Sequence, residues 1–162
     1  MLSTSAAAKQ TRTMVLLPIE IDETKNKRFS GHPECSAVLG VYPEYYKKVG
    51  FNKPWIGYFA SIDGDTIVGT AGYKGKPKDG KVEIAYGTFK SYEGQGIGTE
   101  ICRQLILLAL QTDPYVRITA RTLQDGYASI AILKKNGFQC LGTVYDEEDG
   151  EVFEWELLKN GY

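Results

Sequence analysis

YEGQGIGT, at residues 92–99, is a glycine-rich segment from which the neighbouring elements can be assigned. It follows a strand-like run, KVEIAYGTF at residues 81–89, and leads directly into a helical pattern. The start of a helix exposes unpaired backbone N–H groups and the positive end of the helix dipole, and glycine lets a ligand approach the backbone. The order strand, glycines, helix therefore predicts a site for a phosphate or pyrophosphate.

Two common phosphate-binding motifs do not fit this segment. A P-loop needs a lysine where the helix opens, whereas this helix opens with Gly98, Thr99 and Glu100. A dinucleotide fingerprint needs GxGxxG, and glycines at Gly94, Gly96 and Gly98 miss that spacing by one residue. A purely structural glycine turn and a nucleotide-binding switch stay open as alternatives.

Apolar runs bounded by turn residues predict a sheet whose flanking elements are mainly antiparallel hairpins. These runs are rich in β-branched and aromatic residues, and the pair Asp63-Gly64 accepts the positive φ of a tight turn. The expected strands cover residues 15–19, 55–62, 66–73, 81–89, 116–120, 138–145 and 151–157.

Helices are expected in three regions. Apolar residues recur at helical spacing over residues 97–108, until the Asp-Pro pair at 113–114 ends the pattern. A second helix is expected over residues 125–136, where an Asn-Gly pair supplies a left-handed end. Residues 22–53 are polar and contain prolines that read as breaks, so only one or two short helices are expected there, the clearest near residues 43–49.

The composition is that of an ordinary globular domain. The chain has 162 residues, of which 43% are hydrophobic and 24% charged, so it can bury a core without a metal or a disulfide scaffold. A net charge of −1 leaves no basic excess for phosphate neutralisation, and no nucleic-acid partner is expected. Three widely spaced cysteines and one histidine match none of the usual zinc or Ser-His-Asp arrangements, and no metal site is expected.

Neither a secretion signal nor a membrane segment is expected. Residues 1–13 are small and polar, and we expect a disordered segment there, followed by a single domain at residues 14–162. The longest apolar run, at residues 105–110, is far shorter than the ~20 residues of a membrane helix. We therefore expect a cytoplasmic protein with no membrane partner.

Two motifs, in the same order along the chain, resemble the GNAT superfamily of acyl-CoA-dependent N-acyltransferases. The family hallmark is R/Q-x-x-G-x-G/A at a helix start; GIG at residues 96–98 matches its second half, and Glu93 stands at the R/Q position. The second signature, a helix ending in K-x-G-F, is similar to ASIAILKKNGF at residues 128–138. The resemblance covers about residues 55–157. It implies an α+β, three-layer α/β/α fold: a mixed, mostly antiparallel sheet of about six to seven strands with helices on both faces.

The same resemblance implies acetyl-CoA as co-substrate. Backbone groups of the strand would pair with the pantetheine arm, amides of the glycine segment would bind the pyrophosphate, and the second helix would contact the far side of the cofactor. On this interpretation Glu93 places a negative charge beside the phosphates. The implied cofactor-binding residues are Gly87, Thr88, Phe89, Gly94, Gln95, Gly96, Ile97, Gly98, Thr99, Ser129 and Lys134.

Transfer to an amine requires a base, because a protonated amine has no lone pair with which to attack the thioester. Glu83 is the candidate, since it interrupts an apolar strand and its position resembles the glutamate base of several family members. Exposure to solvent, or substrate binding without proton transfer, is the alternative for this residue. Many members place a tyrosine acid where Leu133 stands here, so Tyr127 is the substitute candidate, with packing as its alternative.

The acceptor is the least defined part of this hypothesis. The resemblance implies an N-acetyltransferase that acts by direct attack, in a ternary complex, of a primary amine of a small molecule or peptide; a homodimer is compatible with such folds. The acidic turn at residues 146–149 is either an attractor for a cationic acceptor or a solvated turn. A non-catalytic acyl-CoA-binding or regulatory module is the alternative function, favoured by the missing acid and by Glu93. Aromatic candidates for the acceptor pocket, or for the core, are Tyr42, Tyr45, Tyr46 and Trp55.

Overall fold

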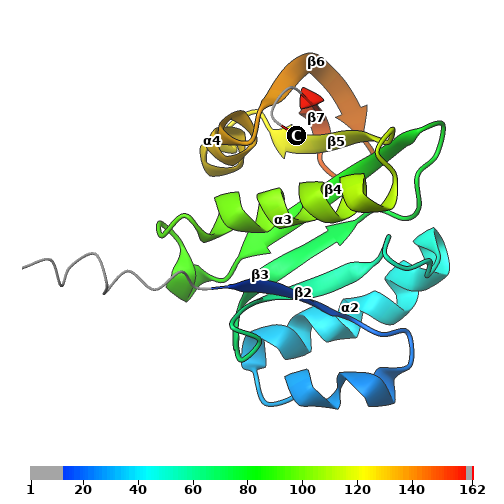
Figure 1. Ribbon diagram of the computed structural model, residues 1–162, viewed down its shortest axis with the longest axis vertical. Coiled ribbons are helices and arrows are strands. Elements are labelled where there is room, and N and C mark those ends of the chain that lie inside the picture. The colour runs from blue at the N-terminus through cyan, green and yellow to red at the C-terminus, as the bar shows by residue number, and fades with distance from the viewer. Residues whose placement is uncertain (1–12, 160–161) are drawn as a thin grey trace, which may run out of the picture.

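Seven strands form one mixed sheet in the computed structural model, which describes residues 13–159 and 162 (Figure 1). The sheet order is β1-β2-β3-β4-β5-β7-β6, and only the β4–β5 pair is parallel. All the expected strands are confirmed. The expected disordered segment covers residues 1–13, of which residues 1–12 lie outside the described residues. The strands are β1 Met14–Pro18, β2 Gly57–Ile62, β3 Thr66–Tyr73, β4 Lys81–Thr88, β5 Arg117–Leu123, β6 Phe138–Asp146 and β7 Gly150–Leu157.

Helices cover both faces of the sheet, which confirms the expected three-layer α+β architecture (Figure 1). Side chains alternate between the two faces of a strand, so Tyr73 contacts α3 while Gly72 lies against Tyr42 of α2 on the other face. Within the described residues, no helix is long and apolar enough to cross a membrane. The helical elements are η1 Glu23–Phe29, α2 Pro33–Val49, η2 Lys90–Tyr92, α3 Ile97–Thr112 and α4 Tyr127–Lys135.

The helix α2 is longer than the sequence predicts. Pro33 opens it at a position where the missing N–H costs nothing, but Pro43 lies inside its 17 residues, so the interpretation of Pro43 as a break is wrong. Aromatic packing stabilises the helix across this residue: the rings of Tyr42 and Tyr46 lie 5.0 Å apart, and the Tyr46 hydroxyl donates to the Ile19 carbonyl at 2.8 Å. Tertiary contacts therefore outweigh the local cost of the proline.

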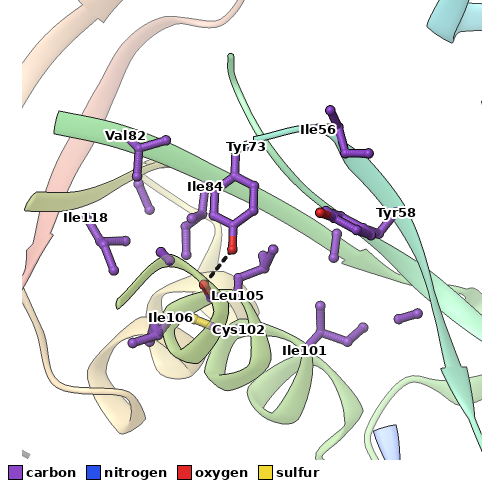
Figure 2. Close-up of a cluster of buried hydrophobic side chains, with 14 of the residues drawn as sticks. Ile56, Tyr58, Tyr73, Val82, Ile84, Ile101, Cys102, Leu105, Ile106 and Ile118 are labelled. Carbon is purple, nitrogen blue, oxygen red and sulfur yellow. Dashed lines mark hydrogen bonds between the residues drawn. The ribbon is translucent and has the colours of Figure 1, made fainter. Parts of the chain in front are cut away.

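The main apolar core lies between the sheet and α3. Ile101, Leu105 and Ile106 are fully buried against β3, β4 and β5 (Figure 2). The Tyr73 hydroxyl spans this layer and donates to the Leu105 carbonyl at 2.7 Å (Figure 2). Cys102 is buried in the same cluster. This core fixes α3, and with it the glycine segment at its start, over the middle of the sheet.

The two halves of the sheet part between β4 and β5. These strands pair only from Lys81 opposite Arg117 to Glu83 opposite Thr119, although β4 continues to Thr88 and β5 to Leu123. Beyond that point each strand stays paired with its other neighbour, β4 with β3 and β5 with β7. Among the described residues, none pairs with the edge of residues 84–88 of β4 that faces β5. We call this gap in the sheet the split.

The helix α4 is attached to α3 at one end. The buried Asn136 side chain donates to the Thr99 carbonyl at 3.2 Å and to the Ile132 carbonyl at 3.0 Å. Nearby, a Cβ atom on Gly98 would lie 2.6 Å from Cδ1 of Ile132, so any larger residue would force the Ile132 side chain to move. These contacts set the distance between the helices that border the split.

Gly69 in β3 lies where β3 and β4 approach closely beside the split, so a substitution there tests whether this approach is required. A methyl group on Gly69 would collide with the Gly87 carbonyl and lie 3.1 Å from Cδ1 of Ile101. We expect Gly69→Ala to lower the free energy of unfolding by about 1–3 kcal/mol, because overpacking forces backbone shifts. Urea unfolding measures this change.

Gly40 provides the matched control, because it lies inside α2 with no atom within 4 Å of an added Cβ. Gly40→Ala is expected to raise the free energy of unfolding by about 0.5–1 kcal/mol through helix propensity. An equal loss of stability in both variants would contradict the steric assignment of Gly69.

Candidate active site

The glycine segment before α3 presents a row of free backbone amides. Gly94 and Gly96 have φ values of 75° and 78°, which glycine adopts without strain, and no side chain caps the helix start at Gly96. The amide of Glu100 bonds to the Gly96 carbonyl at 3.2 Å, whereas the amides of residues 94–99 find no acceptor within the described part of the chain. Such a run of donors at a helix N-terminus fits an anionic group.

A groove of about 650 Å³ runs along this segment, between the free half of β4 and α4. Most of the predicted cofactor residues line it, namely Gly87, Thr88, Gly94, Gly96, Ile97, Gly98, Thr99 and Ser129. Phe89, Gln95 and Lys134 do not line it; Gln95 faces a neighbouring hollow beside Met14, and Lys134 is exposed. Further lining residues that the sequence did not indicate include Tyr86, Tyr92, Ala128, Ile132 and Lys135.

The backbone of β4 offers hydrogen-bonding groups to the split at alternate residues. The N–H of Phe89 donates to the Val68 carbonyl of β3 at 2.8 Å, and Gly87 pairs with the same strand. Because backbone groups of successive strand residues point to opposite edges, those of Tyr86 and Thr88 face the split. Of the predicted trio Gly87, Thr88 and Phe89, only Thr88 thus presents its backbone to the split.

Two smaller cavities meet this groove at Tyr86. One, of about 100 Å³, is lined by Glu83 and shares Tyr86 and Ser129 with the groove. The other, of about 150 Å³, is lined by Tyr42 and Tyr45 and shares Tyr86 with both. Burial raises the pKa of the Tyr86 hydroxyl. The groove on the α3 side and the two cavities therefore lie next to one another at Tyr86.

Glu83 does not lie in apolar surroundings, contrary to the sequence-based expectation. Its carboxylate, 21% exposed, accepts a salt bridge from Lys74 Nζ at 2.7 Å and lies 3.9 Å from Arg121 Nε. Burial lowers the pKa of Lys74, but the hydrogen bond and charge of Glu83 outweigh it and raise the pKa overall. Glu83 is thus half of an ion pair on the α2 side of the split.

Arg121 connects this ion pair to the C-terminal hairpin. Its guanidinium lies 3.0 Å from Asp146 Oδ2 and 3.8 Å from Glu154 Oε2. The backbone amide of Glu148 and the guanidinium of Arg121 lower the pKa of Asp146 to about 2. The acidic turn is therefore partly ordered by internal bonds, and its Asp146 carboxylate already has a cationic partner.

The aromatic candidates separate into two groups. Tyr42 and Tyr45 line the cavity next to Glu83, where burial raises the pKa of Tyr42 to about 12 and also raises the pKa of Tyr45. Tyr46 and Trp55 are buried in the core. Tyr127 is 76% exposed and lines none of the three cavities, so its position gives no support to a role as acid.

Comparisons with known proteins agree with this geometry. Residues 21–139 match the family model described as acetyltransferase (GNAT) domain. The chain is 39% identical over 107 residues to the uncharacterized N-acetyltransferase YjdG of Bacillus subtilis, a match that covers 65% of this chain and 59% of that protein.

Solved structures share the fold at low sequence identity. A spermidine N-acetyltransferase SpeG chimera from Vibrio cholerae and hSSAT has a TM-score of 0.66 at 11% identity, over 90% of this chain and 95% of that one. AAC(6')-Ib in complex with ribostamycin and coenzyme A has a TM-score of 0.66 at 19% identity, over 91% and 94%. With the family model matching most of the described domain, the chain belongs to the GNAT family of acetyltransferases.

Proposed function

We propose that this protein transfers the acetyl group of acetyl-CoA to a primary amine by direct attack in a ternary complex. One observation carries the proposal: a groove with free amides on the α3 side shares Tyr86 and Ser129 with a cavity that Glu83 lines on the α2 side. Cofactor and acceptor can therefore approach from opposite faces of the sheet. The names of two structural neighbours, which refer to spermidine and ribostamycin, support amines as the acceptor class.

Free backbone amides and the free edge of β4 support acetyl-CoA as the ligand of the groove. The amides of residues 94–99 would bind the diphosphate, and the backbone of Thr88 and Tyr86 would bind the pantetheine arm. Ser129 lines both the groove and the Glu83 cavity, which supports a position for it beside the thioester. Lys135, rather than Lys134, supplies a cation to the groove wall.

Glu83 is the group that we propose to take the proton from the amine. It faces the α2 side beside the split, and its pairing with Lys74 shows that a primary ammonium can occupy its hydrogen-bonding position. The N–H of Tyr86, which also lines the Glu83 cavity, is the donor that would stabilise negative charge on the carbonyl oxygen, while its C=O and the backbone of Thr88 serve the pantetheine arm. The leaving thiolate departs without a dedicated acid, since Leu133 is buried and Tyr127 is exposed away from the cavities.

A non-catalytic acyl-CoA-binding module is the second candidate, favoured by the buried leucine at the usual acid position and by Glu93 at the groove. The two functions differ in turnover. We expect acetyl-CoA and CoA to bind in calorimetry, and CoA thiol to be released only when a primary amine is added. Binding without amine-dependent release, across a panel of amines and peptides, would establish the non-catalytic function instead.

The base assignment is tested by Glu83→Gln, which keeps the size of the side chain and removes the proton acceptor. We expect kcat to fall by about 10²–10⁴-fold, the usual contribution of general acid–base catalysis. Affinity for CoA should not change, because Glu83 does not line the groove. Steady-state kinetics and calorimetry give the two quantities.

Glu20→Gln is the matched control for that variant, because Glu20 pairs with Lys53 at 2.5 Å and its side chain is 20% exposed. It should retain wild-type kcat. Full activity of Glu83→Gln across the pH range, or an equal loss in both variants, would overturn the role of Glu83.

Glu93 lines the groove and would face the phosphates as a like charge. An exposed charge pair near 4 Å is worth about 1 kcal/mol in water, so Glu93→Gln should tighten CoA binding about threefold to fivefold. The gain should shrink at high salt. Pantetheine, which lacks the diphosphate, should bind the wild type and Glu93→Gln with equal affinity. If the substitution raised the affinity for pantetheine as much as that for CoA, the diphosphate would not lie beside Glu93.

A further inference from the structure

We propose that the side-chain amine of Lys74 is itself an acceptor, acetylated by the acetyl-CoA bound in the groove of the same molecule. The inference rests on the proposed function, because it uses the same thioester and the same base. It adds a modification site in which the chain supplies its own amine. The observation behind it is that Lys74 occupies the hydrogen-bonding position in front of Glu83 that an external amine would need.

The position of Lys74 follows from the register of β3 and β4. The N–H of Lys74 donates to the Glu83 carbonyl at 2.9 Å, so the two residues lie opposite one another on neighbouring strands. Gly72, two residues earlier, lies against Tyr42 on the α2 side, and strand alternation puts Lys74 on that same side. The ammonium is then 2.7 Å from Glu83 Oε2, inside the cavity that joins the groove at Tyr86 and Ser129.

Other lysines with carboxylate partners lack this placement. Lys53 pairs with Glu20, and Lys47 with Glu44, but neither pair lines the groove or the cavities that join it. Lys135 lines the groove but not the Glu83 cavity. Lys74 alone, among the described lysines, combines a paired carboxylate with a wall of the Glu83 cavity.

Transfer of the acetyl group to Lys74 needs only Glu83, the thioester and solvent. The ammonium of Lys74 gives one proton to Glu83, and the freed lone pair of Nζ attacks the carbonyl carbon of the thioester. An N–C bond forms, the C–S bond breaks, and CoA leaves as the thiolate with the electron pair of that bond. The second proton of the attacking nitrogen is lost to solvent or to the thiolate, which leaves a neutral secondary amide on Lys74.

The product would change the site. A secondary amide carries no charge and cannot form the salt bridge with Glu83, so Arg121 becomes the remaining cationic partner of that carboxylate. The acetylated side chain also fills part of a cavity of about 100 Å³. Acetylation of Lys74 should therefore lower turnover of external amines, and a bound external amine should protect Lys74.

The test incubates the full chain with acetyl-CoA in the absence of any amine. Intact mass spectrometry should show the addition of one acetyl group, and peptide mapping should place it on Lys74. The rate should not depend on protein concentration, because donor and acceptor sit in one molecule. Lys74→Arg, which keeps the positive charge, should abolish the modification, and Glu83→Gln should slow it roughly a hundredfold or more.

Lys53 is the internal control in the same sample, because it is also paired with a glutamate and lies outside the three cavities. The inference is overturned if Lys74 is acetylated no faster than Lys53, or equally fast in urea-unfolded protein. Either result would show that the acetylation is non-enzymatic. If external amines are turned over in a separate assay but Lys74 stays unmodified after incubation with acetyl-CoA alone, this inference alone is overturned. Failure to bind CoA at all would overturn the proposed function together with it.

Discussion

The parting of β4 from β5 is the constraint on which the site depends. Three residue pairs hold the strands together up to Glu83 and Thr119; beyond them β4 follows β3 and β5 follows β7. A strand edge without a partner is costly unless something binds it. The free backbone of Tyr86 and Thr88 is therefore both a gap in the sheet and the place where a ligand can add hydrogen bonds.

Charge is distributed differently on the two sides of this gap. On the α3 side the polarity comes from backbone amides at a helix start, which suit an anion and need no particular side chain. On the α2 side it comes from a network in which Lys74 and Arg121 face Glu83, Asp146 and Glu154. Under the proposed function, this separation would let the chain dispense with the R/Q side chain of the family motif, because Glu93 is exposed and the free amides belong to the backbone.

Periodicity and turn chemistry in the sequence were sufficient to predict the sheet and the helices α3 and α4, because strands and amphipathic helices follow local patterns. Tertiary packing was not predictable, and it carries α2 through Pro43. The partners of Glu83 were also missed, since they depend on strand register and on a parallel crossover rather than on neighbours in sequence. Lys135 replaces Lys134 in the groove because one residue turns a helix by about 100°.

The bond between the Asn136 side chain and Thr99 has a mechanical consequence. It fastens one end of α4 to the start of α3, where the diphosphate would lie, and leaves the opposite end of α4 without a comparable anchor to α3 among the described residues. The wall of the groove beside Gly98 is therefore held in place by a hydrogen bond within the chain, and it needs no ligand to take this form.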